Sequence, residues 1–184
     1  FPLNLVILFE YIKILDNEIT IFLNSYNNEF LNFLMLLISN KYIWIPLYLL
    51  LIYLLKKLDS KNFIRNISIC ILSVIISDFI TSSLMKPFFE RLRPCSNEDL
   101  KSIINIVSTC SGKYGFASSH ASTTFSLATS FYLINSKKIK YLFIWSIVIG
   151  YSRIYLGVHF FADVFAGFFV GMITAISIFY LFKK

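Results

Sequence analysis

Long apolar stretches separated by short charged clusters dominate the chain beyond residue 40. A membrane-spanning helix needs about 20 mainly apolar residues to cross roughly 30 Å of hydrocarbon. Candidate spans cover residues 42–55, with 30–38 as an upstream extension, 63–85, 119–134, 141–155 and 161–182. The pattern predicts an all-α protein, a polytopic membrane helix bundle with five transmembrane helices.

The first forty residues follow a different pattern. Apolar side chains such as Leu15 and Phe22 recur at helical spacing among polar ones such as Asp16 and Asn24. This mixture is typical of an amphipathic helix in the membrane interface, and a sixth span here would be short and polar. We therefore expect an N-terminal interfacial segment, residues 1–40, and a transmembrane core, residues 41–184.

Composition supports a membrane protein. Apolar residues make up 57% of the chain and charged residues 15%, and the mean hydropathy is +0.72. A soluble domain has no means of burying so much apolar surface. The net charge is +7, but the basic residues stand in small groups between apolar runs, so we do not expect a nucleic-acid partner.

The distribution of basic residues predicts the orientation. Lysine and arginine are enriched in cytoplasmic loops. Two connections and the C-terminus carry such residues: Lys56, Lys57, Lys61, Arg65, Lys137, Lys138, Lys140, Lys183 and Lys184. We therefore expect an integral protein of the inner (cytoplasmic) membrane, whose loops 87–117 and 156–160 face the periplasmic, extracytoplasmic side.

The first of three clusters on that outward side holds Lys86 and Arg93, seven residues apart. Pro87 and Pro94 both interrupt helix, so the connection can curl back and aim both cations at one point. The alternative is a pair of interfacial cations that anchor a helix end.

The second cluster, Ser118, Ser119 and His120, opens the third predicted span. Serines cap helix starts, and the free amides there attract a phosphate. His120 is placed to donate a proton to a leaving group. The alternative is an ordinary serine cap beside an interfacial histidine.

The third cluster contains Arg153, Gly157, His159 and Asp163. His159 and Asp163 are four residues apart, so on a helix they share a face, and the carboxylate can accept one imidazole proton while the other nitrogen attacks. Gly157 permits a turn that brings Arg153 to the same place. A buried histidine satisfied by a carboxylate is the alternative, but it gives Arg153 no role.

Together these clusters place the only two histidines and three cations at one membrane face. Charges near a membrane core are costly, so their collection at one depth indicates a functional site. Nearby, we expect Glu90 and Arg91 to pair at the surface. Cys95 and Cys110 bracket the outward loop, where an oxidising compartment permits a disulfide, but the sequence leaves their pairing open.

At these residues the chain resembles the type 2 phosphatidic acid phosphatase superfamily, whose signature is K-x6-R-P, P-S-G-H and S-R-x5-H-x3-D. The first and third parts match in full, and the resemblance covers roughly residues 67–182. In the middle part Ala117 stands where the family has proline, and Ser119 where it has glycine. The residues that match are Lys86, Arg93, Pro94, Ser118, His120, Ser152, Arg153, His159 and Asp163.

The resemblance implies a role for each site residue. His159 is the nucleophile that becomes phosphorylated, Asp163 orients it, and His120 protonates the leaving group. The phosphoryl oxygens are bound by Lys86, Arg93, Ser118, Ser119 and Arg153. No metal or other cofactor is implied, because the cations supply the positive field that phosphoryl transfer needs.

The implied substrate is a membrane lipid phosphate or diphosphate taken from the bilayer, with undecaprenyl diphosphate first. Phosphatidylglycerophosphate, phosphatidic acid and a lipid A phosphate are the alternatives. Transfer to an acceptor other than water stays open, as does the oligomeric state. A non-enzymatic transporter or scaffold would use the cations to bind an anion but would need no His159 and Asp163 pair.

Overall fold

The computed structural model describes residues 2–135 and 140–183, and within them every regular element is a helix. The long helices are α1 (Pro2–Asn24), α2 (Glu29–Ser39), α3 (Ile45–Leu58), α4 (Phe63–Phe79), α7 (Ser119–Asn135), α8 (Tyr141–Tyr155) and α9 (Phe161–Leu181). The short ones are η1 (Lys41–Trp44), η2 (Ile80–Met85), α5 (Lys86–Phe89), η3 (Pro94–Ser96) and α6 (Glu98–Lys101). The predicted all-α membrane bundle is confirmed.

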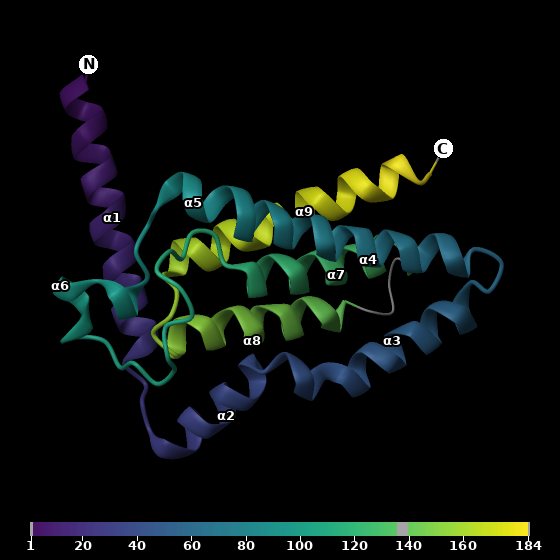
Figure 1. Cartoon of the computed structure of the whole chain (residues 1–184), viewed down its shortest axis with the longest axis horizontal. Helices are drawn as coiled ribbons and strands as arrows, with labels where there is room; N and C mark the ends of the chain where they lie inside the picture. Colours follow the sequence, from purple (N-terminus) through teal and green to yellow (C-terminus); the bar gives the residue numbers. More distant parts are fainter. Residues whose placement is uncertain (1, 136–139, 184) are drawn as a thin grey trace.

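Helix α7 lies at the centre of the bundle and packs against α4, α8 and α9 (Figure 1). It has 17 residues and α8 has 15, so both are shorter than the roughly 20 residues of an isolated span. Helix α7 is also rich in serine and threonine, whose hydroxyls bond within the bundle; Thr124 Oγ1, for example, lies 2.7 Å from Ser146 Oγ on α8. Helix α7 is therefore surrounded mainly by α4, α8 and α9, whereas an outer helix is surrounded mainly by lipid.

Close packing of α7 on α9 depends on two glycines that our sequence analysis did not single out. Gly167 and Gly171 form a G-x-x-x-G motif on α9. A Cβ at Gly167 would come within 2.5 Å of the Ser118 carbonyl oxygen, and one at Gly171 would collide with the Ser122 carbonyl oxygen. Small residues let membrane helices approach closely, so this motif fixes the contact between α9, which carries Asp163, and α7, which carries Ser119 and His120.

Among the described residues, two helical stretches are long and apolar enough to cross a membrane by themselves. One is continuous from Phe63 to Phe89, because α4 passes through the π-helical turn η2 into α5; the other is Phe161–Leu181. A third candidate is bent by 64° at its middle, where Glu29–Ser39 meets Lys41–Leu58. The predicted upstream extension of the first span is thus a separate helix joined at an angle.

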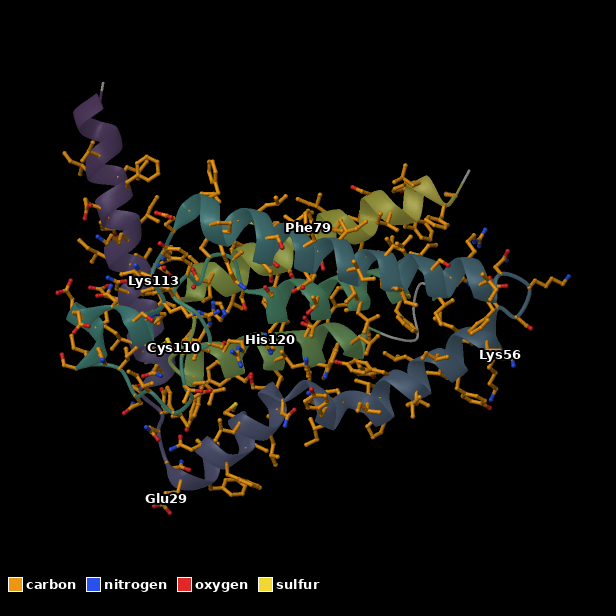
Figure 2. All side chains as sticks on the ribbon, in the orientation of Figure 1. Glu29, Lys56, Phe79, Cys110, Lys113 and His120 are labelled. Atoms are coloured by element: carbon orange, nitrogen blue, oxygen red, sulfur yellow. A yellow bond between two sulfur atoms is a disulfide. The ribbon has the colours of Figure 1, made fainter. Side chains whose placement is uncertain are left out.

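The two ends of the bundle differ in chemistry. In Figure 2, Lys56 lies at one end, whereas Cys110 and Lys113 lie at the other, where α1 crosses the bundle. The clusters predicted to form the site follow or precede helix ends on the side of Cys110. Of the cations used to predict orientation, Lys137, Lys138 and Lys184 lie outside the described residues.

Candidate active site

The loop between α8 and α9 carries His159. Gly157 adopts a positive φ of 74°, which ends α8 and turns the chain toward α9. The amide of His159 donates to the Arg153 carbonyl oxygen at 3.3 Å, which folds the loop back on the end of α8. As a result the His159 side chain is only 2% exposed.

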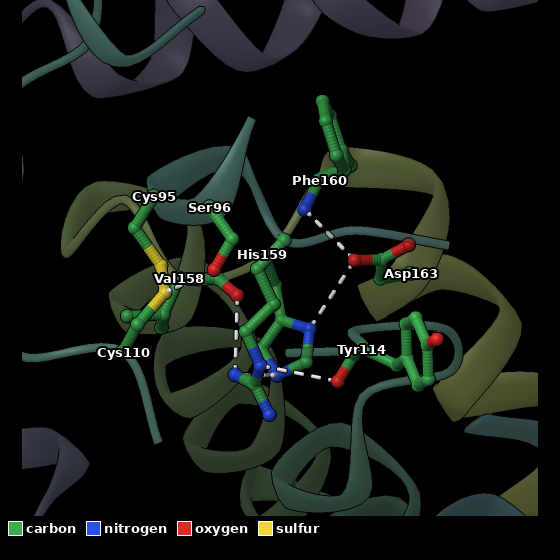
Figure 3. The surroundings of a disulfide bond; sticks show 9 residues. Cys95, Ser96, Cys110, Tyr114, Val158, His159, Phe160 and Asp163 are labelled. Atoms are coloured by element: carbon green, nitrogen blue, oxygen red, sulfur yellow. Dashed lines mark hydrogen bonds and ion pairs between the residues drawn. A yellow bond between two sulfur atoms is a disulfide. The ribbon is translucent and has the colours of Figure 1, made fainter. Parts of the chain in front are cut away.

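Asp163 holds one nitrogen of this imidazole, as the four-residue spacing predicted. Its Oδ2 lies 3.2 Å from His159 Nδ1 and accepts a 3.1 Å hydrogen bond from the Phe160 amide (Figure 3). The prediction assumed that His159 and Asp163 lie on one helix. Instead, His159 lies just before α9, and Asp163 contacts it from the first turn of that helix. The capping geometry therefore fixes the carboxylate and the ring together.

Arg93 approaches the other imidazole nitrogen. Its Nη1 lies 3.3 Å from His159 Nε2 and donates to the Val158 carbonyl at 3.2 Å, while its Nε donates to the Tyr114 carbonyl at 3.1 Å. A guanidinium has donors only, so Nε2 must be the acceptor in this contact. The proton consequently sits on Nδ1, facing Asp163, and Nε2 keeps its lone pair on the side of the cation.

The electrostatic surroundings keep His159 uncharged. Burial, together with the positive charges of Arg93, Arg153 and Lys86, holds the pKa of His159 well below its ordinary value. Burial also lowers the pKa of Arg93, although Asp163 opposes that shift. A neutral imidazole whose Nε2 carries no proton is the form in which histidine acts as a nucleophile.

Lys86 stands at the start of α5, where the prediction placed a phosphate ligand. Its Nζ donates to Ser119 Oγ at 2.8 Å, and Ser119 Oγ lies 2.8 Å from Ser82 Oγ. Ser82 in turn donates to Asp78 Oδ1 at 3.2 Å. This chain of contacts ties the end of the α4–α5 stretch to the first residue of α7, so Lys86 and Ser119 meet as expected.

Two predicted phosphate ligands have buried polar atoms without a partner among the described residues. Arg153 donates from Nη1 to Ser39 Oγ, but its Nε is left unpaired. Ser118 donates its amide to the Asp163 carbonyl at 2.9 Å, but its Oγ is unpaired. The sequence analysis expected this amide to be free for an anion, but it is already hydrogen-bonded.

His120 lies in the first turn of α7, within electrostatic range of Lys86, Arg93, Arg153 and His159. With Ser119 it forms the polar end of a cavity of about 740 Å³. Apolar side chains of α3, α4, α7 and α8 make up most of the remaining wall, including Leu51, Val74 and Leu127. An apolar cavity that reaches His120 and Ser119 suits a molecule with a long apolar tail and a polar head.

The structure adds residues that the sequence analysis missed. We expected Arg91 to pair with Glu90. Instead, Arg91 donates to Asp163 Oδ1 at 2.9 Å and to Asp16 Oδ2 at 2.5 Å. The physical reason is that Asp163 is fully buried, so its second oxygen needs a cation from inside the fold. The available signal was the spacing of Asp16, Thr20 and Asn24, which follow each other four residues apart on α1.

A membrane bundle that holds a neutral imidazole between a carboxylate and buried cations defines a membrane-embedded phosphatase of lipids. In the described ranges, no three histidine, cysteine, aspartate or glutamate side chains are grouped as a metal site would require. The expectation that the enzyme works without a metal stays a prediction.

Comparison with known proteins identifies the family. The sequence model of the PAP2 superfamily matches residues 67–184, so the chain belongs to this superfamily. The resemblance found in the sequence is thereby confirmed, and the chain is a lipid phosphatase of the PAP2 type.

Two curated relatives bear the name lipid A 4'-phosphatase. The one from Porphyromonas gingivalis is 36% identical over 169 residues, which cover 90% of this chain and 72% of the relative. The one from Bacteroides thetaiotaomicron is 31% identical over 173 residues, which cover 88% of this chain and 74% of the relative.

Solved structures share the fold. The crystal structure of Aquifex aeolicus LpxE superimposes with a TM-score of 0.70 at 27% identity, covering 89% of this chain and 93% of that one. A PAP2-type phosphatidylglycerolphosphate phosphatase from Bacillus subtilis gives a TM-score of 0.64 at 19% identity, covering 95% of this chain and 87% of that one. The second likeness concerns the fold alone.

Proposed function

We propose that the chain hydrolyses a phosphate monoester of a lipid A-type glycolipid through a phosphohistidine on His159. The observation that carries the proposal is the pair of contacts on the buried ring, with Asp163 at Nδ1 and Arg93 at Nε2. These contacts favour a neutral, oriented nucleophile beside cations that attract a phosphoryl group.

In the proposed reaction, Nε2 of His159 attacks phosphorus and the bond from phosphorus to the lipid oxygen breaks. His120 gives its proton to the departing oxygen, and Asp163 balances the charge that develops on the ring. Water then attacks the phosphohistidine, His120 takes the proton of that water, and inorganic phosphate leaves. Lys86, Arg93 and Arg153, with Ser118 and Ser119, bind the phosphoryl oxygens, and no metal takes part.

The names of the relatives favour lipid A over undecaprenyl diphosphate, which the sequence alone had put first. Both substrates combine a phosphate group with long apolar chains, so the apolar wall of the cavity does not discriminate between them. What separates them is the bond that breaks. Lipid A gives a sugar hydroxyl as the leaving group, whereas undecaprenyl diphosphate gives a polyprenyl phosphate.

The test is phosphate release by the detergent-purified protein in excess EDTA, with bisphosphorylated lipid A, undecaprenyl diphosphate and phosphatidylglycerophosphate as parallel substrates. We expect the highest kcat/KM with lipid A and loss of release in His159→Ala. Lys101→Ala, which removes an exposed cation of the outward loop, serves as the control and should match wild type. Full activity of His159→Ala, or dependence on added metal, would overturn the proposal.

We further propose that the protein lies in the inner membrane, with the site on its periplasmic face and residues 1–40 at the interface. The bundle end with Lys56 carries basic residues, and the site end carries the Cys95–Cys110 disulfide. In intact spheroplasts a membrane-impermeant maleimide should label Lys101→Cys but not Lys61→Cys. The reverse pattern would invert the topology.

A further inference from the structure

Helix α1 presents one polar stripe to the rest of the protein. Asp16, Thr20 and Asn24 follow each other at four-residue spacing and therefore lie on one face. They are 6%, 1% and 2% exposed, and between residues 6 and 24 they are the buried positions of the helix. Burying polar groups is unfavourable unless each finds a partner, so the partners of this stripe show what it does.

Two residues of the stripe cap the start of α9. The Phe161 amide donates to Thr20 Oγ1 at 3.0 Å, and the Ala162 amide donates to Asp16 Oδ1 at 2.8 Å. The residue at the cap position of α9 is Phe160, whose side chain has no acceptor. Helix α1 thus supplies from another part of the chain the oxygen atoms that a serine or aspartate would ordinarily provide locally.

The third residue holds the end of α8. Asn24 Nδ2 donates to the Tyr155 carbonyl at 2.8 Å and to the Ile154 carbonyl at 3.3 Å. Its Oδ1 accepts from the Asn105 amide at 2.7 Å. A single face of α1 therefore binds the last turn of α8 and the first turn of α9. The loop that carries His159 connects these two turns.

The stripe also reaches the carboxylate that orients His159. Arg91 bridges Asp16 and Asp163, and its guanidinium lies 3.9 Å from the centre of the Phe160 ring. With Asp163 bound to His159 Nδ1, a continuous path of ion pairs and hydrogen bonds runs from α1 to the imidazole.

From these contacts we infer that Asp16, Thr20 and Asn24 are positioning residues of the phosphatase reaction. By fixing both helix ends and Arg91, they hold Nε2 of His159 at the angle from which it attacks phosphorus. The inference rests on the proposed role of His159. It goes further because it gives α1, which lies outside the matched family region of residues 67–184, a part in catalysis.

The test compares substitutions that change the hydrogen bonding of the stripe at nearly constant shape. Thr20→Val removes the acceptor of the Phe161 amide, and Thr20→Ser keeps it. Asp16→Asn keeps an acceptor for the Ala162 amide but removes the charge that holds Arg91. We expect kcat to fall roughly 10- to 100-fold in Thr20→Val and Asp16→Asn, because small misplacements of a reacting group have effects of this size. Thr20→Ser should restore kcat to within about threefold of wild type.

A second readout separates positioning from general damage. Inorganic phosphate, the product, is held through the cations, so its inhibition constant and the KM should stay within about twofold of wild type in every α1 variant, measured on the monodisperse fraction. The inference is overturned if kcat is unchanged in Thr20→Val and Asp16→Asn, or if kcat, KM and phosphate inhibition deteriorate together. His159→Ala, assayed alongside, distinguishes the two proposals. If it is inactive while the α1 variants equal wild type, only the positioning role fails; if it is active, the proposed function fails.

Discussion

At the scale of single residues, the chemistry depends on which imidazole nitrogen of His159 carries the proton. Arg93 cannot accept a hydrogen bond, and the carboxylate of Asp163 cannot donate one. Their contacts at 3.3 Å and 3.2 Å therefore select the tautomer in which Nδ1 is protonated. Burial and nearby cations keep the ring neutral, so both requirements of a nucleophile are met before the substrate arrives.

Replacing the carboxylate by an amide tests this assignment. In Asp163→Asn the side-chain amide can turn its NH2 group toward Nδ1, which would stabilise the tautomer protonated on Nε2. We expect kcat for phosphate release to fall roughly 10³- to 10⁴-fold, as when the orienting aspartate of a catalytic triad is changed to asparagine. Assays of phosphate release over time measure kcat for the variant and for wild type. A variant that keeps a tenth of wild-type kcat would show that Asp163 has only a structural role.

The pH profile tests the influence of the cations on His159. Burial and the positive charges of Arg93, Arg153 and Lys86 lower the pKa of His159, so the ring stays unprotonated below its ordinary pKa and activity persists on the acid side. Removing one positive charge in Arg93→Gln raises that pKa, so the acid limb of kcat/KM should move to higher pH. The ionisation of the substrate is common to both profiles and cancels from the comparison. An unmoved limb, or a shift to lower pH, contradicts the electrostatic argument.

At the scale of helices and loops, three separate segments converge on the loop of His159. The Cys95 amide donates to the Gly157 carbonyl at 3.1 Å, and the Val107 amide to the Leu156 carbonyl at 3.4 Å. Cys95 and Cys110 are disulfide-bonded, with Cα atoms 6.2 Å apart, so the outward loop is closed where it packs against this loop (Figure 3). Together with α1, the closed loop restrains the loop that carries the nucleophile.

The approach of α7 to α9 offers a test at the same scale. In Gly171→Ala the added methyl group meets the Ser122 carbonyl oxygen, so the helices must separate. We expect a loss of about 1–3 kcal/mol in the free energy of unfolding, the usual effect of overpacking. Ser177→Ala, on the exposed face of the same helix, should change it by less than about 0.5 kcal/mol. Reversible unfolding in mixed micelles measures both, and equal values would dismiss the packing argument.

At the scale of the whole molecule, the sequence predicted the class of fold and the family. The apolar runs indicated the bundle because a bilayer imposes their length, and the spacing of Lys86, Arg93, His159 and Asp163 indicated the family because phosphoryl transfer requires those groups. Both kinds of signal are local in the sequence. The structure accordingly brings Lys86 to Ser119 and Arg93 to His159.

What escaped prediction depends on contacts between distant segments. Asp16 pairs with Arg91, 75 residues away, and caps Ala162, 146 residues away. From its neighbours in sequence, Asp16 was expected on the polar face of an interfacial helix. Local periodicity shows which residues share a face, but it does not show what that face contacts. The G-x-x-x-G motif of α9 carried a signal that could have been used, since it predicts a close helix contact without naming the partner.

In the proposed reaction the phosphoryl group passes through His159. Its most direct test is rapid quenching of the purified enzyme with lipid A labelled at the phosphate, followed by peptide mapping under alkaline conditions that preserve phosphohistidine. We expect a transient, acid-labile label on the peptide that contains His159, absent in His159→Ala. A label on His120, or phosphate release at the wild-type rate with no labelled peptide, would contradict it.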